Sequence, residues 1–250
     1  MENKVPIDIS IIIPTKNEKD YIAPTIEQYR DFMEKYRLEI IVSDAYSTDG
    51  TAELVRAYEQ QSGGRIRLVQ GPLKQNIAIG RNAGAAQARG HILFHSDADV
   101  HIPNKDTFFT AVLAKFRDTN IVAATVPIWV YPEERSWKDR LYHILMNLLI
   151  RISFTAGVYL AKGECQLVRR EVFERIGGYN EKIVAGEDCN LFYRLHKEGR
   201  IAYLYRLSVH HSPRRFRQYG YVRLTMIYLR EGISLLFRGK SWSDEWKPVR

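Results

Sequence analysis

Cysteine is scarce in this chain of 250 residues, which contains only Cys165 and Cys189. So few cysteines do not predict a disulfide framework, and they are typical of a protein from a reducing compartment. The two residues also lack the spacing of a thiolate metal site. We therefore expect a cytoplasmic protein that is stabilised by its core rather than by cross-links.

No apolar run predicts a helix that spans a bilayer. The most apolar window, 141–160, contains His143, Asn147 and Arg151, and a spanning helix rarely carries three such groups together. Residues 1–4 also lack the charged segment and following apolar segment of a cleaved signal peptide. The window at 141–160 instead predicts an amphipathic helix that runs into a turn.

Acidic residues are fewer than basic ones. The chain has 29 Asp and Glu against 37 Lys and Arg, and its formal net charge is +8. A basic balance favours anionic partners such as phosphorylated substrates, anionic lipids or nucleic acid. The excess is concentrated from Arg194 to Arg250 and is densest at 213–217.

Strand and helix patterns alternate in the first half of the chain. Apolar, β-branched runs predict strands at 8–13, 38–42, 66–69, 92–95 and 121–126. Helical spacing and capping residues predict helices at 20–36, 52–61, 75–89 and 105–116. This alternation indicates a mostly parallel sheet, in which ligands bind beyond the carboxyl ends of the strands. Polar residues just after these strands should therefore converge at one edge.

The second half has fewer clear strands. We expect a loop at 127–135, strands at 164–169 and 201–204, and helices at 137–155, 170–176, 188–198 and 216–237. The last of these helices is both aromatic and basic. We expect this half to complete the first half rather than to fold independently.

Two carboxylates, Asp97 and Asp99, flank Ala98 directly after a predicted strand. Their hard oxygen ligands suit Mg²⁺ or Mn²⁺, and such an ion stabilises a diphosphate leaving group. The alternative is an Asx turn that leads into a helix capped by Asn104. The buried strand before the pair favours the functional interpretation.

Asp44 and Arg81 each allow two interpretations. The Asp44 carboxylate follows a strand and can accept N–H groups of a uracil or guanine, or it can start the turn completed by Asp49, which itself fits a helix cap. Arg81 lies in a helix rich in small residues and can reach a ribose or diphosphate with its planar guanidinium, or it can face solvent.

Glu187 and Asp188 open a helix after Gly186. The helix dipole stabilises carboxylates there, so capping and a general-base role both remain open. His210 and His211 lie on an extended segment and point in opposite directions, so at most one faces a site. That histidine would complete a metal site with Asp99, whereas the alternative is a structural or exposed histidine.

These segments together resemble the family-two glycosyltransferases with the GT-A fold, over roughly residues 9–211. The motifs that carry the resemblance stand in the family's order: Ser10–Glu18, Asp44–Thr51, Gly80–Gly84, Asp97–Asp99, Arg170–Phe173 with Gly177–Tyr179, and Gly186–Asp188. The resemblance implies an α/β, Rossmann-like fold with a mostly parallel central sheet flanked by helices. It also implies a nucleoside-diphosphate-sugar donor, Mn²⁺ or Mg²⁺, and inversion at the anomeric carbon.

The resemblance assigns roles residue by residue. The nucleotide sugar would be bound by Pro14, Thr15, Asn17, Glu18, Asp44, Arg81, Asp97, Ala98 and Asp99. The metal would be bound by Asp99 and His211, with His210 as the alternative. Asp188 would be the general base, and Glu187 would contact the acceptor or the sugar. The implied units are a domain at 1–212, with a nucleotide-binding half at 1–126 and an acceptor half at 127–212, and a helical basic extension at 213–250.

The chain departs from the family pattern in ways that bear on its substrate. Ala45 stands where many relatives have a second acid, which affects base recognition. A Gln-x-x-Arg-Trp motif is absent, which favours transfer of one sugar. The acceptor would be a hydroxyl or phosphate of a glycan, a lipid phosphate or a small molecule, and no nucleic acid is expected.

Two other classes of function stay open at this point. One is a nucleotide-sugar or nucleic-acid binding module without activity, and the other is a nucleotidyltransferase. The basic tail has its own hypothesis, in which Arg214, Arg215, Arg217 and the helix to Phe237 place the protein peripherally on an anionic inner membrane face or hold an acceptor phosphate. The alternative is a packed C-terminal helix with a solvated basic face.

Overall fold

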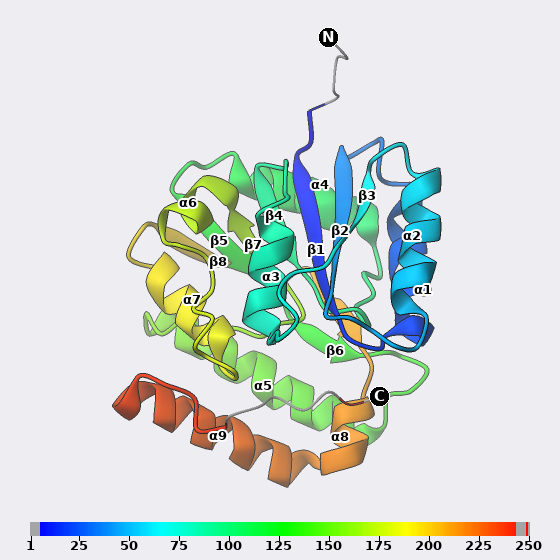
Figure 1. Ribbon diagram of the computed structural model, residues 1–250. Coiled ribbons are helices and arrows are strands. Elements are labelled where there is room, and N and C mark those ends of the chain that lie inside the picture. Colours follow the sequence, from blue (N-terminus) through cyan, green and yellow to red (C-terminus); the bar gives the residue numbers. More distant parts are fainter. Residues whose placement is uncertain (1–5, 244–248, 250) are drawn as a thin grey trace.

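A seven-stranded sheet in the order β3-β2-β1-β4-β7-β5-β8 forms the centre of the protein in a computed structural model that describes residues 6–243 and 249 (Figure 1). Its strands are β1 (Ile9–Thr15), β2 (Leu38–Asp44), β3 (Ile66–Val69), β4 (Ile92–His95), β5 (Ile121–Thr125), β7 (Gln166–Arg169) and β8 (Arg200–Tyr203). Neighbouring strands are parallel except that β7 runs antiparallel to both β4 and β5.

The mostly parallel sheet is the predicted one, and it aligns the strand ends as expected. Thr15 of β1 pairs with Asp44 of β2, and Ile12 of β1 pairs with His95 of β4. The loops that follow β1, β2 and β4 therefore begin at the same edge. Because β7 lies between β4 and β5, the second half of the chain completes the sheet of the first half.

Helices cover both faces of the sheet. The helices are α1 (Lys19–Arg30), α2 (Thr51–Gln61), α3 (Ile77–Ala85), α4 (Lys105–Phe116), α5 (Trp137–Thr155), α6 (Arg170–Arg175), α7 (Glu187–Leu195), α8 (Arg214–Tyr219) and α9 (Tyr221–Arg238). Side chains of α1, α2 and α4 pack in one apolar cluster, and those of α3, α6 and α7 pack in a second.

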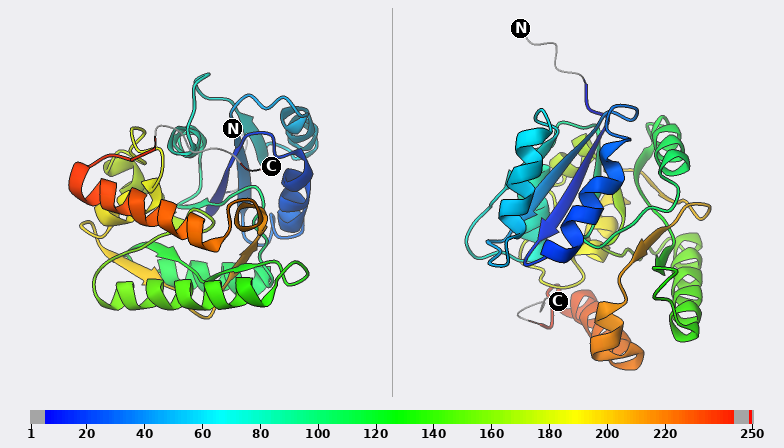
Figure 2. Two further views of the ribbon diagram at one scale, coloured as in Figure 1. Left: turned by 90° about the horizontal axis from the view of Figure 1, so that it is seen from below. Right: turned by 90° about the vertical axis from the view of Figure 1, so that its right-hand side faces the viewer.

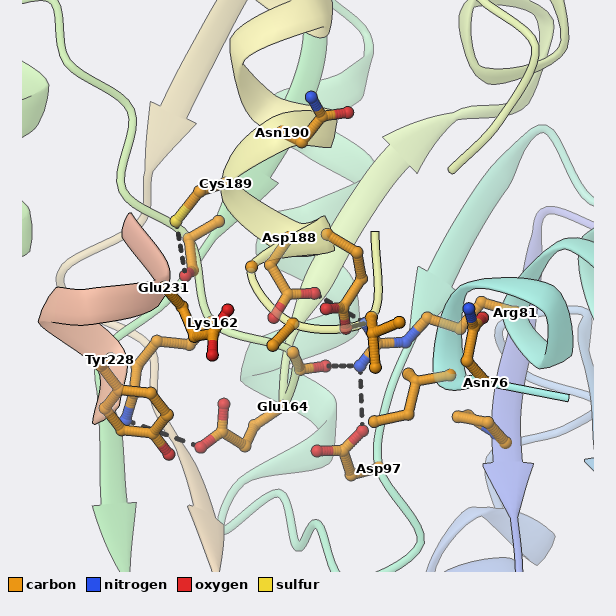
Figure 3. A pocket seen from close by; sticks show the side chains of 18 of the residues that line it. Asn76, Arg81, Asp97, Lys162, Glu164, Asp188, Cys189, Asn190, Tyr228 and Glu231 are labelled. Atoms are coloured by element: carbon orange, nitrogen blue, oxygen red, sulfur yellow. Dashed lines mark hydrogen bonds and ion pairs between the residues drawn. The ribbon is translucent and has the colours of Figure 1, made fainter. Parts of the chain in front are cut away.

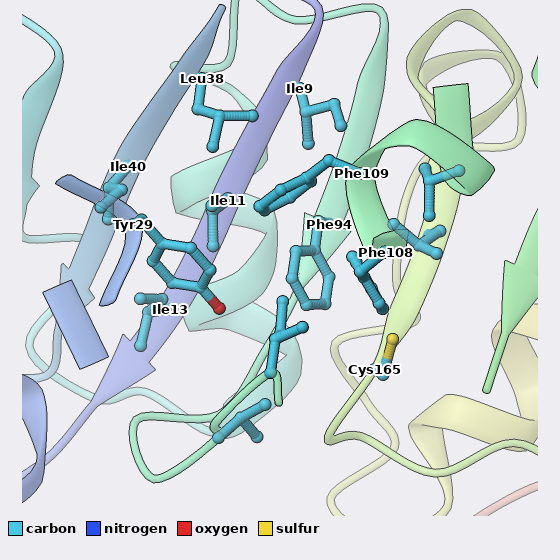
Figure 4. Packing of buried hydrophobic residues seen from close by; sticks show 14 of the residues in the cluster. Ile9, Ile11, Ile13, Tyr29, Leu38, Ile40, Phe94, Phe108, Phe109 and Cys165 are labelled. Carbon is cyan, nitrogen blue, oxygen red and sulfur yellow. The ribbon is translucent and has the colours of Figure 1, made fainter. Parts of the chain in front are cut away.

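Both clusters draw on alternate residues of the same strands. Ile9, Ile11 and Ile13 of β1 belong to the first cluster, where they lie near Tyr29 and Phe94 (Figure 4), whereas Ile12 belongs to the second. Because both faces of β1 are covered, its sequence is a nearly continuous apolar run rather than an alternating one.

Several predicted boundaries were wrong. α1 ends at Arg30 and is followed by turns to residue 37, and α3 begins after its cap Asn76 and ends at Ala85. The segment predicted as a loop at 127–135 contains β6 (Ile128–Val130), which pairs in parallel with β9 (Val209–His211). Strands this short carry little local signal, and only the pairing of segments far apart in sequence defines them.

The basic tail forms two helices rather than one. Gly220, with φ +74°, separates α8 from α9. Both α5 and α9 lie across the same end of the molecule, below the carboxyl ends of β1, β2 and β4 (Figures 1 and 2). Among residues 6–243 and 249, none of these helices has the length and apolarity needed to cross a bilayer.

Asp139, at the start of α5, joins the tail to the rest of the structure. Its buried carboxylate accepts hydrogen bonds from Ser136, from both terminal nitrogens of Arg217 at 3.0 and 2.6 Å, and from Tyr221. Burial alone would raise the pKa of Asp139, but these hydrogen bonds outweigh burial and lower it. The division of the chain near residue 212 stays a prediction.

Replacing Asp139 with Asn should therefore loosen the junction between α5 and α8. We expect Asp139→Asn to lower the free energy of unfolding at neutral pH by about 2 kcal/mol, less than for a fully buried pair because Arg217 is 44% exposed. The stabilisation is fully present above pH about 4, the pKa of an unfolded aspartate, and is lost as pH falls through the lower folded pKa. Urea titrations at several pH values measure this, with Asp106→Asn, at an exposed pair, as the control. An equal loss at every pH would contradict the role of the Asp139 charge.

Candidate active site

A cavity of about 1900 Å³ opens at the carboxyl edge of the sheet, between the strand loops and helices α5 and α9. Most of the residues expected at the site line it: Pro14, Thr15, Glu18, Arg81, Asp97, Ala98, Asp99, Glu187, Asp188 and His211. Asn17, Asp44 and His210 do not line it. The cavity exceeds the usual range for a single small ligand, roughly 300–1,000 Å³, so it has room for two.

The Arg81 side chain lies at the centre of the cavity wall and is 1% exposed. Its Nη1 donates hydrogen bonds to Asp188 Oδ1 at 2.6 Å and Glu187 Oε1 at 3.1 Å, and its Nη2 donates to Asp97 Oδ1 at 3.0 Å (Figure 3). Arg81 therefore joins three of the predicted site carboxylates, which lie 16 to 107 residues away in sequence.

Two glycines allow Arg81 to occupy this position. A Cβ on Gly84 would lie 2.6 Å from Ile12 Cγ2, so the glycine allows α3 to pack closely on β1. A Cβ on Gly163 would lie 2.4 Å from Arg81 Nη2, where the Gly163 carbonyl instead accepts a hydrogen bond at 3.1 Å. The small residues of α3 therefore allow this helix to pack closely on the sheet.

Asp188 lies in the first turn of α7, directly after Glu187, and its Oδ1 atom is held from two sides. Besides Arg81, Gln166 of β7 donates a hydrogen bond from Nε2 to Oδ1 at 2.9 Å, and Tyr179 in turn donates to Gln166. The Asp188 side chain is 18% exposed and lines the cavity. With Oδ1 held, Oδ2 is the oxygen left to take a proton from a bound hydroxyl.

Burial raises the pKa of both Glu187 and Asp188. Burial, together with the neighbouring Asp188 charge, raises the pKa of the Glu187 carboxyl from 4.5 to about 8. Burial also raises the pKa of Asp188, although Arg81 opposes that effect. One guanidinium therefore faces three carboxyl groups, and the raised pKa of Glu187 favours its protonated form at neutral pH.

A second arginine, Arg214 of α8, lies on the metal-binding candidates. It donates two hydrogen bonds to the Glu18 carboxylate at 2.8 and 3.1 Å, and its Nε lies 3.3 Å from Asp99 Oδ2. Burial raises the pKa of Asp99 to about 7, and the Arg214 charge counteracts this. Asp99 therefore shares its carboxylate with a residue of the basic tail.

His211 rather than His210 faces the cavity. In β9 the two side chains point in opposite directions, as predicted; His210 lies in a bridge with His101, whereas His211 is buried and lines the cavity. Its Nδ1 lies 3.7 Å from Glu164 Oε1, and burial lowers the pKa of His211 to about 4. The ring is therefore neutral at pH 7 and can act as a metal ligand.

Asp99 and His211, the two candidate metal ligands, fit a cation only if that cation also takes ligands from other groups. Within residues 6–243 and 249, no group of three or more His, Cys, Asp or Glu side chains is arranged to hold a metal. The buried Nε2 of His211 has no hydrogen-bond partner in that part of the chain. His211 and Asp99 therefore suit an ion that takes its remaining ligands from a diphosphate and water, provided that Asp99 separates from Arg214.

Asp44 and Asn17 hold the strand loops together. The buried Asp44 carboxylate accepts hydrogen bonds from the Ser47 backbone at 2.9 Å, from Gln70 at 3.2 Å and from Thr15 at 3.2 Å. Asn17, in the left-handed region with φ 55°, accepts a hydrogen bond from the Thr48 backbone at 2.8 Å. The role of both residues in nucleotide binding stays a prediction.

Several residues of the site were missed from the sequence. Gln166 and Gly163 hold Asp188 and Arg81, and Lys162 and Glu164 form an ion pair of 3.5 Å in the cavity wall. Isolated residues of these types have no distinctive spacing. Arg214 was noticed only as part of a basic cluster, because nothing local links it to Asp99.

Comparison with known proteins gives consistent matches. The sequence profile of the family described as Glycosyl transferase family 2 matches residues 10–177. Succinoglycan biosynthesis protein ExoA of Rhizobium meliloti is 29% identical over 193 residues, which cover 76% of this chain and 58% of that protein. Dolichyl-phosphate beta-glucosyltransferase of Dictyostelium discoideum is 38% identical over 119 residues, which cover 42% of this chain and 36% of that protein.

One solved structure matches almost the whole chain. The mannosyltransferase PcManGT from Pyrobaculum calidifontis, in complex with GDP-Man and Mn²⁺, has a TM-score of 0.73 at 21% identity. The match covers 98% of this chain and 67% of that one. At this identity the likeness shows a shared fold.

The buried proton on Glu187 should make stability depend on pH. Because its folded pKa of about 8 lies above its ordinary value of 4.5, the contribution of Glu187 to stability is full below pH 4.5 and is lost as pH rises through about 8. We expect Glu187→Gln to gain stability relative to the wild type as pH rises across this window. Urea unfolding at each pH tests this, with Glu174→Gln on the exposed face of α6 as the control. If the difference in free energy of unfolding between Glu187→Gln and the wild type does not change with pH, the raised pKa of Glu187 is contradicted.

Proposed function

Because the chain belongs to glycosyl transferase family 2, we propose that it is a metal-dependent, inverting glycosyltransferase that moves one sugar from a nucleoside-diphosphate sugar to an acceptor. The observation that carries the proposal is the Arg81 cluster, which holds one oxygen of Asp188 at the wall of a cavity large enough for two substrates. A module that only binds nucleotides has no need of such a carboxylate.

The donor would lie over the ends of β1 and β4. Pro14, Thr15 and Glu18 line that part of the cavity together with Asp97 and Asp99. When bound, the cation would neutralise charge on the departing diphosphate, with Asp99 and His211 as its protein ligands. The structure with GDP-Man and Mn²⁺ supports this arrangement by its shared fold.

Asp188 would act as the general base. Its Oδ2 would accept the proton of the acceptor hydroxyl while the acceptor oxygen bonds to the anomeric carbon. The bond from that carbon to the β-phosphate oxygen breaks, and the nucleoside diphosphate leaves with the electron pair. Attack from the side opposite the leaving group inverts the anomeric carbon. Arg81 and Gln166 hold Asp188 Oδ1 and so keep the base oriented.

Two arginines of the basic tail, which the sequence suggested for membrane or phosphate binding, form ion pairs within the protein. Arg214 is paired with Glu18 and Asp99, and Arg217 with Asp139, so neither guanidinium projects freely toward a membrane. We retain a peripheral contact with an anionic membrane, but on other residues than these two arginines. The match to a dolichyl-phosphate glucosyltransferase supports a lipid-phosphate acceptor as one of the candidates.

Nucleotide and metal binding can be tested before the acceptor is known. We expect Mn²⁺ to increase the thermal stabilisation by the matching member of a panel of UDP, GDP and dTDP sugars, because only the folded protein binds them. In Asp99→Asn the additional thermal stabilisation by Mn²⁺ should disappear. The control Asp106→Asn, at an exposed position of α4, should keep it. If Mn²⁺ gives Asp99→Asn the same additional stabilisation as the wild type, Asp99 is not a metal ligand.

Replacement of the base should separate binding from chemistry. We expect Asp188→Asn to lower the rate of donor hydrolysis or transfer by about 1,000-fold, within the range for loss of a general base. Stabilisation by the donor nucleotide should persist, since Asp188 faces the acceptor. Asn190→Asp, two residues further along α7 and also in the cavity wall, controls for changes of charge nearby. Wild-type rates in folded Asp188→Asn would contradict the assignment.

A further inference from the structure

Helix α5 carries an apolar stripe that no other part of the described chain covers. Leu141, Ile144, Leu145, Leu148 and Ile152 recur every three or four residues and are each between 43 and 55% exposed. This spacing places them on one face of the helix. In a single domain, a face of this kind marks an interaction surface.

Helix α9 carries a second stripe. Val222, Met226, Leu229 and Ile233 follow the same spacing and are between 54 and 73% exposed. Seen from below, α5 and α9 lie side by side across one end of the molecule (Figure 2, left). We call the nine side chains of the two stripes the α5–α9 face.

The exposed charges that α5 and α9 themselves carry are of one sign. The only acids in the two helices, Asp139 and Glu231, are buried. The exposed charged residues of these helices are all basic: Lys138, Arg140, Arg151, Arg223, Arg230 and Arg238. Apolar side chains surrounded by positive charge are complementary to an anionic bilayer. A second copy of the same face would instead bring like charges together.

The cavity reaches this face between the two helices. Met146, Leu149 and Ile150 of α5 and Leu229 and Ile233 of α9 line the same cavity as Asp188. Leu229 and Ile233 are also members of the α5–α9 face and are about half exposed. An apolar passage, lined by these side chains of α5 and α9, therefore joins that face to the candidate base.

The passage ends at a buried cation. Lys162 Nζ lies in the cavity wall, where it pairs with Glu164 at 3.5 Å and has no hydrogen-bond partner within residues 6–243 and 249 (Figure 3). Besides its ion pair with Glu164, this ammonium group therefore has N–H bonds left for polar oxygens of a ligand. The apolar passage and the unsatisfied donor together suit a ligand with a long hydrocarbon part and a polar head.

We propose that the acceptor is an amphiphile, and that it reaches Asp188 from a bilayer on which the α5–α9 face rests. Its hydrocarbon part lies between α5 and α9, and its head, a hydroxyl or a phosphate, lies between Lys162 and Asp188. This inference rests on the proposed sugar transfer for its chemistry. Binding to a bilayer and recognition of a hydrocarbon chain can be measured without any transfer.

Vesicle flotation tests the surface. The wild type should float with vesicles that contain phosphatidylglycerol and should float less with phosphatidylcholine alone. Leu145→Glu combined with Met226→Glu should lower the bound fraction about tenfold or more, because it removes apolar burial and adds repulsion. These two side chains are outside the cavity, so stabilisation by nucleotide should not change. Ala57→Glu with Gln60→Glu on α2 makes the same change of charge and should float like the wild type.

Binding of short amphiphiles tests the passage. Octyl phosphate and octyl β-glucoside, below their micellar concentrations, should bind at least about tenfold more tightly than ethyl phosphate and methyl β-glucoside, since two buried methylene groups are enough for that ratio. Of the two phosphates and the two glucosides, the pair with the larger preference for the octyl chain identifies the head group of the acceptor. Leu149→Glu with Leu229→Glu should abolish the preference for the chain.

Some results would overturn the inference and leave the proposed function intact. One such result is equal binding of the long-chain and short-chain ligands. The other is a protein that does not bind vesicles and forms a dimer in solution, which Leu145→Glu with Met226→Glu dissociates. Loss of nucleotide binding in the wild type would instead count against the proposed function. The two failures are therefore distinguishable.

Discussion

The candidate site depends on a single buried guanidinium. Arg81 is the point at which α3, the loop after β4 and the start of α7 meet, through its hydrogen bonds to Asp97, Glu187 and Asp188. Isolated carboxylates at this depth would repel one another, and desolvation would make their charges costly. The raised pKa of Glu187 favours its protonated form, which reduces the negative charge that Arg81 has to balance.

A second guanidinium links the tail to the donor side. Arg214 bridges Glu18 and Asp99, while the next turn of the tail is held to α5 by Arg217 and Asp139. The tail is therefore part of the site rather than an appendage, and α9 closes the cavity opposite α5. The Asp99 carboxylate that we propose as a metal ligand is also paired with Arg214, so metal binding there would be coupled to the position of α8. Helices α5 and α9 also carry the apolar α5–α9 face, so this face and the cavity are built on the same two helices.

The central sheet was predictable because its signals are local. Each buried strand is a short apolar run between turn residues, and each intervening helix has its own periodicity and caps, such as Asn104 of α4. The paired β6 and β9 were missed because three-residue strands are defined only by each other. The break at Gly220 was also missed, since a glycine within a helical pattern does not by itself end the helix.

The sequence alone determined the fold class, the family resemblance and the position of the acidic motifs at the strand ends, because periodicity and motif order are properties of neighbouring residues. Only the tertiary structure decided how those residues act on one another. Burial raises the pKa of Glu187. The alternation of side chains along β9 points His211, and not His210, into the cavity. The fold also brings Arg214 next to Asp99, although the two are far apart in sequence. Desolvation, charge pairing and side-chain direction depend on distances in space, and separation along the chain does not encode them.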